Sequence, residues 1–288
     1  MSVLEFVLIF FKFITLSVAL LSAGGIVFYN IFYLELVKSR QFINNALFTA
    51  IIFAIILSLI YLFLDAARFS GSIDGIIDYG LQKMILQSHL SVARLLLILG
   101  LLIIVFSHKI ASANRVILTT IGVSLVVISF TYTGHTSENP FRIILAPLLI
   151  MHLFVVIFWF GALIPLYFII KIETNQRAGL IVNDFSKKAT FLVPLIFIAG
   201  IILSIILMEG INFLRDPYGQ ILLLKITVFS ILMLIAALNK LRLGPDLELG
   251  KPNAARNLQR AIIFEILFIF VIVGATTILT GFFSPETT

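Results

Sequence analysis

The chain has 288 residues, of which 61% are hydrophobic and only 12% are charged, and its mean hydropathy is +1.16. Soluble domains carry about 25% charged residues, so this composition excludes a soluble enzyme and indicates a polytopic membrane protein. Cysteine is absent, which excludes disulfides, thiolate metal sites and cysteine nucleophiles. The net charge of +6 does not indicate a nucleic-acid partner, because excess Lys and Arg in a membrane chain typically mark the cytoplasmic loops.

Apolar runs long enough to cross a bilayer recur along the whole chain. A membrane helix needs roughly 20 apolar residues, and the first run lacks the basic start of a cleaved signal peptide. We therefore predict an all-α fold, a bundle of eight transmembrane helices in a single integral membrane domain over residues 1–288. The expected spans are 3–34, 42–64, 90–106, 116–132, 143–170, 191–208, 221–238 and 262–282.

The distribution of basic residues between the connections predicts the orientation. One set of loops holds thirteen Lys and Arg residues and the other holds four: Arg68, Lys83, Arg142 and Arg215. Basic residues accumulate on the cytoplasmic side, so the loops around Lys187 and Lys251 are expected to face the cytoplasm. Both termini, and the loop with Asp65, Asp74 and Asp78, are expected to face outward.

A weak internal repeat appears when the first four spans are aligned with the last four. Gly24 and Gly25 then align with Gly161, and Arg94 aligns with Lys225. Four helices per unit would make the two repeats parallel. The alternative is chance similarity between apolar helices, so the 4+4 parallel pseudo-repeat is a hypothesis.

His152 is the strongest candidate site residue because ionisable groups within a bilayer are costly and often functional. It lies about ten residues into the fifth span, about 15 Å from the start of that helix. Met151 is adjacent in sequence but about 100° away around the helix, which makes it a second-choice ligand. The alternative is a neutral imidazole hydrogen-bonded to a neighbouring helix.

Two further histidines precede His152 on the expected outer side. His135 follows Gly134, whose missing side chain lets the backbone turn closely around a bound group, and it comes 17 residues before His152. His89 opens the third span near Met84 and is a weaker candidate ligand. Imidazole and thioether groups together favour copper, as Cu(I) or Cu(II), although spacing does not separate copper from zinc or haem.

Three other ionisable residues fall inside the expected spans and carry alternative roles. Arg94 and Lys225 could extend to the outer surface, pair with an acid, or meet the propionates of a haem. Glu265 could pair with Arg260 or relay a proton. A b-type haem protein, with membrane histidines as axial ligands, is therefore the alternative function.

The sequence motifs of common soluble enzymes are missing. No Gly-rich phosphate loop, zinc-protease histidine pair or serine nucleophile elbow occurs. We therefore do not expect an enzyme, and we expect any transport to be driven by a gradient, by delivery from a partner or by trapping.

Four stretches in order resemble the inner-membrane copper resistance protein D (CopD) family, which includes YebZ-like proteins. The resemblance is strongest over residues 130–285. It rests on Thr133–Thr136, on His152–Leu166 with Trp159 and Gly161, on Phe185–Ala189, and on Tyr218–Lys225 continuing to Asn239 and Pro245.

The resemblance implies an eight-helix protein of the cytoplasmic membrane that is associated with copper uptake. By position, His135 and His152 match the histidines of the family, and Trp159 with Gly161 completes the second motif. The stretch Phe160–Ala162 departs from the more usual pair of glycines. The family also implies a small extracytoplasmic copper-binding partner of the CopC type, expected here as a separate chain.

Overall fold

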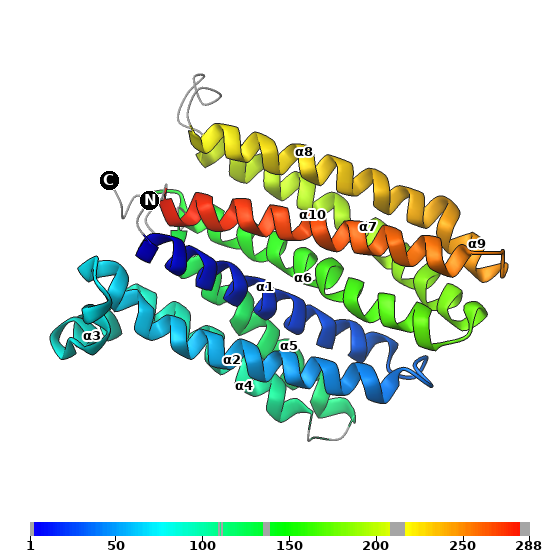
Figure 1. Cartoon of the computed structure of the whole chain (residues 1–288), viewed down its shortest axis with the longest axis horizontal. Helices are drawn as coiled ribbons and strands as arrows, with labels where there is room; N and C mark the ends of the chain where they lie inside the picture. Colours follow the sequence, from blue (N-terminus) through cyan, green and yellow to red (C-terminus); the bar gives the residue numbers. More distant parts are fainter. Residues whose placement is uncertain (1–2, 109, 111, 135–138, 208–216, 283–288) are drawn as a thin grey trace. The chain divides into compact units, whose positions relative to one another are not determined.

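The computed structural model describes residues 3–108, 110, 112–134, 139–207 and 217–282, and within these ranges the chain is helical with no strand. Figure 1 shows the course of the chain. The elements are α1 (Val3–Phe32), α2 (Arg40–Ser70), the 3-10 turn η1 (Ile73–Ile77), α3 (Tyr79–Leu86), α4 (His89–Ser107), α5 (Ser112–Ser129), the 3-10 turn η2 (Phe130–Tyr132), α6 (Arg142–Ile172), α7 (Asn175–Leu207), α8 (Pro217–Leu238), the π-helical turn η5 (Asn239–Leu243), α9 (Gly244–Glu248) and α10 (Ala254–Phe282).

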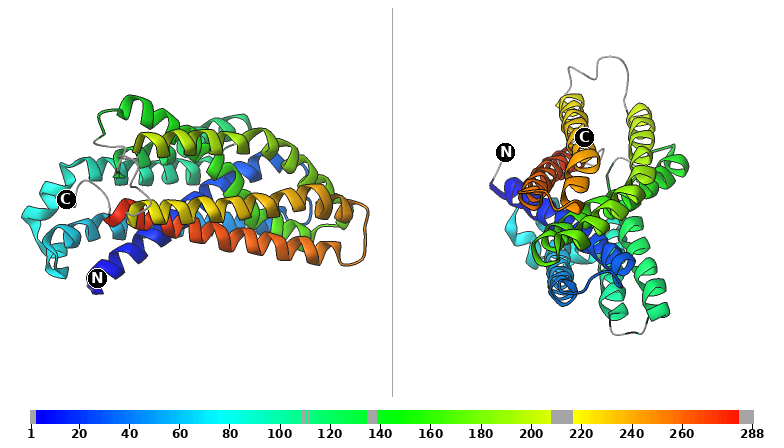
Figure 2. Two further views of the ribbon diagram at one scale, coloured as in Figure 1. Left: turned by 90° about the horizontal axis from the view of Figure 1, so that it is seen from above. Right: turned by 90° about the vertical axis from the view of Figure 1, so that its right-hand side faces the viewer.

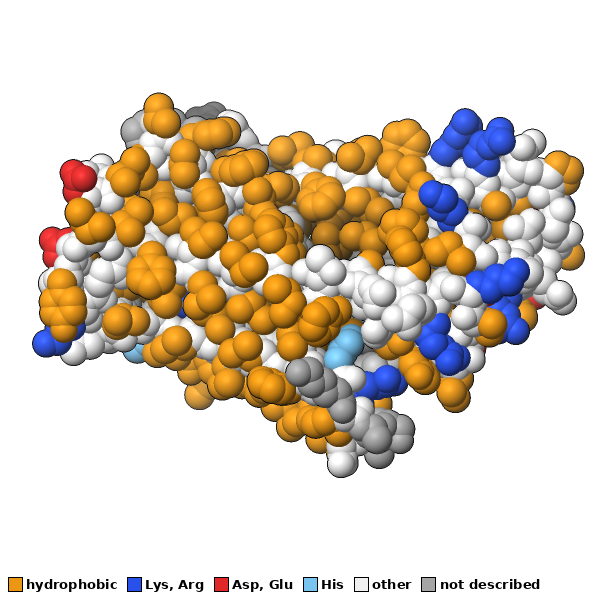
Figure 3. All heavy atoms as spheres, turned by 60° about the horizontal axis from the view of Figure 1, so that its bottom comes forward, with side chains coloured by type: hydrophobic (Ala, Val, Ile, Leu, Met, Phe, Trp, Pro, Cys, Tyr) orange, Lys and Arg blue, Asp and Glu red, His pale blue; other side chains and the backbone are white. Residues whose placement is uncertain are grey.

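The eight-helix membrane bundle expected from composition is confirmed. Eight helices in the described residues are long and apolar enough to cross a membrane. The face drawn in Figure 3 is covered mostly by hydrophobic side chains, and Ile143 and Phe191 are 86% and 84% exposed. Such an apolar exterior would aggregate in water, whereas a lipid bilayer solvates it.

Several helices extend beyond the expected boundaries, and one boundary error concerns a basic segment. The sequence places Lys187 in a loop before a span at 191–208, but α7 begins at Asn175 and includes Lys187. Nothing between Leu180 and Phe191 breaks the helix, and Lys188 pairs with Asp184 one turn earlier. Hydropathy detects only the apolar part of such a helix.

A second boundary error concerns Asp65. We expected it in an outer loop, yet α2 continues to Ser70 and buries Asp65, which is 1% exposed. The expected loop after it also contains η1 and the eight-residue helix α3. Helix α3 starts at a side-chain cap, where Asp78 accepts a hydrogen bond from the backbone N–H of Leu81.

The described chain divides into two compact units. Unit 1 comprises residues 1–23, 48–150 and 276–288, and unit 2 comprises residues 24–47 and 151–275. In unit 1, helices α4 and α5 approach closely at Gly100 and Gly122, where an added Cβ would lie 2.6 to 2.7 Å from the carbonyl oxygen of the other glycine. The hydroxyls of Ser107 and Thr119 meet at 3.0 Å in the same interface.

Unit 2 contains a second close crossing, between α1 and α6. A Cβ at Gly24 would lie 2.0 Å from the carbonyl oxygen of Ile157, and one at Gly161 would lie 2.1 Å from the carbonyl carbon of Gly24. Both clashes are with backbone atoms, which cannot rotate away. Small residues of this kind let membrane helices pack at short range, where van der Waals contact replaces the missing hydrophobic drive.

A carboxylate connects two helix ends in unit 2. Glu173 follows α6, and its Oε1 accepts hydrogen bonds from the N–H of Val37 and from the N–H and hydroxyl of Ser39, at 2.7 to 3.0 Å. Burial alone would raise the pKa of Glu173, but the hydrogen bonds from Ser39 and Val37 outweigh burial and lower that pKa. An ionised Glu173 therefore fixes the α1–α2 connection.

Helices α8 and α10 form the last hairpin of unit 2. Figure 2 shows them running side by side, and the chain turns between them through η5 and α9. In a π-helical turn one extra residue enters the turn, which re-aims the side chains around it. Asn239, the first residue of η5, is buried at 8% exposure.

The α1–α6 crossing leads to a stability prediction. We expect Gly161→Ala to lower the free energy of unfolding by about 1 to 3 kcal/mol, because the new methyl group meets the backbone of Gly24. Gly200→Ala in α7 is the matched control, since nothing lies within 4 Å of its added Cβ. Thermal unfolding in detergent measures both, and equal melting temperatures for the two variants would contradict the close crossing.

Candidate functional site

His152 lies ten residues into α6, as the sequence predicted, and is half-buried. The imidazole has a hydrogen bond with the backbone of Ile196 on α7. Its Nδ1 is buried and has no hydrogen-bond partner among the described residues. In a neutral imidazole the nitrogen that carries no proton keeps a lone pair, which can bind a metal ion. The interaction with α7 matches the alternative expected from sequence, a neutral imidazole bonded to a neighbouring helix.

Aromatic residues hold the part of α6 that follows His152. Trp159 is 3% exposed, and its ring meets that of Phe229 on α8 edge-on at 6.1 Å. Phe229 also contacts Phe197 of α7 at 4.9 Å. Helices α6, α7 and α8 are therefore joined about two turns beyond His152 on α6. Met151, which precedes His152 in the chain, is half-buried. The stretch His152–Leu166 thus combines one ionisable side chain with residues that pack the helices together.

Lys225 acts electrostatically on His152. It lies eight residues into α8, is half-buried, and forms no ion pair with a carboxylate within the described ranges. Its charge and the imidazole are close enough to interact. A cation near His152 therefore experiences repulsion from Lys225 as well as attraction to the imidazole.

The other predicted histidine ligands lie outside the described residues or in unit 1. His135 lies outside the described residues, while Gly134 before it has a φ of +76°, a left-handed conformation that favours glycine. His89 is exposed at the start of α4 and belongs to unit 1, whereas His152 belongs to unit 2. In the described part of the chain no three His, Asp or Glu residues gather as a metal site.

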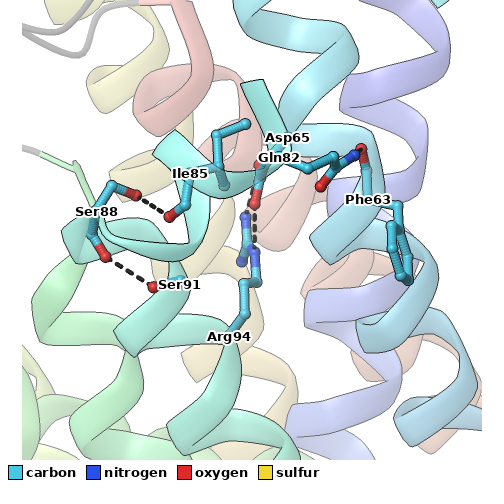
Figure 4. A network of polar contacts seen from close by, with 7 residues as sticks. All are labelled: Phe63, Asp65, Gln82, Ile85, Ser88, Ser91 and Arg94. Atoms are coloured by element: carbon cyan, nitrogen blue, oxygen red, sulfur yellow. Dashed lines mark hydrogen bonds and ion pairs between the residues drawn. The ribbon is translucent and has the colours of Figure 1, made fainter. Parts of the chain in front are cut away.

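Arg94 pairs with an acid, which is one of the three roles expected for it. Its Nε lies 3.0 Å from Oδ2 of Asp65, and its guanidinium lies 3.9 Å from the centre of the Tyr61 ring. Arg94 is 9% exposed. Figure 4 shows Arg94 of α4 pointing toward Asp65 of α2, with Gln82 of α3 next to the pair. Sequence reasoning missed Asp65 because hydropathy ended the second span before it.

Glu265 meets a partner that the sequence did not suggest. We expected Arg260 or a proton relay, but Nδ2 of Asn239 donates to Oε1 of Glu265 at 2.6 Å. Both side chains are buried, at 8% and 3% exposure, and Oδ1 of Asn239 has no partner among the described residues. Asn239 and Glu265 are both thirteen residues from Pro252 in the α8–α10 turn. An antiparallel hairpin places such positions opposite each other, so this signal was available in the sequence.

A bis-histidine haem does not fit unit 2. That unit contains one histidine, His152. His89 and His108 of unit 1 are 19 residues apart along α4, which is about 28 Å. A pair of axial haem ligands is therefore not available within unit 2, nor from His89 with His108.

The ion pair in unit 1 leads to a second stability prediction. Arg94→Met leaves the buried Asp65 carboxylate without its partner, and we expect a loss of about 3 to 5 kcal/mol in the free energy of unfolding. The double variant Arg94→Met with Asp65→Leu removes both charges and should recover most of the loss. Thermal unfolding of both variants in detergent checks this, and a double variant no more stable than Arg94→Met would contradict it.

Comparison with known proteins finds similarity to one family. Residues 179–279 match the profile of the family described as CopD, copper resistance protein D. A curated protein named copper resistance protein D, from Pseudomonas syringae pv. tomato, is 25% identical over 258 residues, which cover 83% of this chain and 82% of that protein. No solved structure matches the chain. The two matches support the assignment of this eight-helix membrane protein to the copper resistance protein D family.

Proposed function

We propose that this chain carries copper inward across the cytoplasmic membrane, with both termini on the outer side. The observation that carries the proposal is the unpartnered Nδ1 of His152, within the bundle of a CopD-family protein. An imidazole lone pair binds copper well, and the neighbouring thioether of Met151 adds preference for Cu(I). His135 would accept copper at the outer surface, and His89 would be an accessory ligand there.

The delivery of copper is proposed to involve a second protein. The resemblance to CopD proteins implies a copper donor, whose surface would meet the outer loops. We propose a separate extracytoplasmic copper-binding protein of the CopC type in this role. Gly134, with its left-handed backbone beside Thr280, would let the chain turn closely around copper at His135.

The bond from His152 to the backbone of Ile196 supports the proposed ligand role. When one imidazole nitrogen donates to a carbonyl, the tautomer and the ring orientation are fixed, and the other nitrogen is a better ligand. Trp159 and Gly161 support the same helix through α8 and α1. The proposed roles of these two residues are therefore to position α6.

Copper content tests the proposed ligands. We expect purified protein loaded with Cu(I) to lose bound copper in His152→Ala and to lose part of it in Met151→Leu. His108→Gln is the matched control, because His108 lies after the C-terminal end of α4 in unit 1 and is not a proposed ligand. Unchanged copper in His152→Ala would overturn the ligand role, and a Soret band that disappears in His152→Ala would identify a haem protein instead.

Removing the charge of Lys225 should raise the affinity for copper, whereas removing His152 should lower it. We expect Lys225→Met to raise the Cu(I) affinity at His152 by about threefold to tenfold, since a like-charge repulsion of roughly 1 kcal/mol is removed. Lys12→Met is the matched control, because Lys12 is also an intramembrane lysine but donates to the carbonyl oxygen of Thr280 in unit 1. Competition with a Cu(I) chelator measures the affinity, and weaker binding by Lys225→Met would contradict the prediction.

A further inference from the structure

Glu265 occupies an unusual place for a carboxyl group. It lies eleven residues into α10, about 17 Å from the start of the helix, and is 3% exposed. Within the described residues, its carboxyl group forms a hydrogen bond with Asn239. An ionised carboxylate in this position would lack both water and a cation, which costs several kcal/mol.

The charged residues on the elements around Glu265 are engaged elsewhere or exposed. On η5, Lys240 donates to the hydroxyl of Thr190 and Arg242 is exposed. On α9, Glu248 accepts from Asn183 of α7, and Asp246 pairs with Lys251. On α7, Asp184 pairs with Lys188, and Lys187 is exposed. On α10, both Arg256 and Arg260 are exposed. On α6, Lys171 is exposed, and Glu173 after that helix binds the α1–α2 connection.

The contact with Asn239 suits either protonation state of the carboxyl group. Its separation of 2.6 Å lies at the short end for an N–H···O bond and within the range of an O–H···O bond. The amide oxygen and nitrogen of Asn exchange places by a flip. With Oδ1 turned toward Glu265, the carboxyl O–H donates to it, and the amide N–H2 takes the position that Oδ1 held before the flip.

We propose that Glu265 and Asn239 form a proton-binding site at the junction of α8 and the π-helical turn. Glu265 carries the proton as a carboxylic acid that donates to Oδ1 of Asn239. On release of the proton, the amide flips and its N–H donates to the carboxylate. The ligand of this site is the proton, because a Cu(I) ion prefers sulfur and nitrogen to amide and carboxylate oxygen.

The π-helical turn gives this exchange a mechanical consequence. Asn239 begins η5, and its carbonyl accepts the N–H of Gly244, the first residue of α9. Gly179 of α7 packs against the backbone of Glu248 in α9, where an added Cβ would lie 2.7 Å from the Cα of Glu248. A change in the Asn239–Glu265 bond therefore acts on a turn that is tightly packed on α7.

Infrared spectroscopy tests the site without copper. We expect a C=O stretching band of a protonated carboxyl group near neutral pH in the purified protein, which shifts in D₂O and disappears in Glu265→Gln. Glu173→Gln is the matched control: Glu173 is a carboxylate of the same unit that three hydrogen bonds keep ionised, so its loss should leave the band. A band that persists in Glu265→Gln would overturn the proposal.

Stability provides an independent readout. Glutamine mimics a protonated glutamate, so Glu265→Gln should unfold at the same temperature as the parent protein at neutral pH and at a higher one at alkaline pH. A variant that fails to fold, or that loses stability at neutral pH, would show that the ionised carboxylate is needed, and this would also overturn the proposal.

A coupling of this proton to copper movement rests on the proposed function. In proteoliposomes with an internal pH-sensitive dye, copper addition should change the internal pH for the parent protein but not for Glu265→Gln, while Glu265→Gln still binds copper. Protein that binds no copper would refute the proposed function and leave the infrared result unaffected. Copper-driven pH changes of equal size in both proteins would refute the coupling.

Discussion

A polar group inside a bilayer must find its partner within the protein, and this constraint organises both units. Water is absent there, so an unsatisfied donor or acceptor costs several kcal/mol. The protein meets the constraint locally where Ser58 donates to the carbonyl of Ala54 one turn earlier. The protein meets the same constraint between helices where Arg94 pairs with Asp65 and where Asn239 bonds to Glu265.

Close helix packing follows from the same solvent. Lipid tails are as apolar as leucine, so helices associate through contact of backbones rather than by excluding water. The crossing of Gly24 and Gly161 fixes α6 on α1, and the ring contact of Trp159 and Phe229 fixes it on α8. His152, two to three turns earlier on α6, therefore projects from a helix that is held on two sides.

The groups left without partners suggest where the protein acts. Nδ1 of His152 and Oδ1 of Asn239 are both buried and unpartnered within the described residues. One is a soft nitrogen donor that suits copper, and the other is a hard oxygen beside a carboxyl group that suits a proton. Glu173 differs from these two groups, because three hydrogen bonds satisfy its charge. We therefore assign Glu173 a structural role.

The sequence by itself determined the membrane class, the eight helices and the candidacy of His152, because hydropathy and the cost of buried charge depend only on local composition. It also predicted that Arg94 could pair with an acid, but it did not identify Asp65, whose span it ended too early. Only the tertiary structure decided the partners of Arg94, Glu265 and Gly161. Those contacts join residues 26 to 137 positions apart in the sequence, and helix packing rather than local pattern brings such residues together.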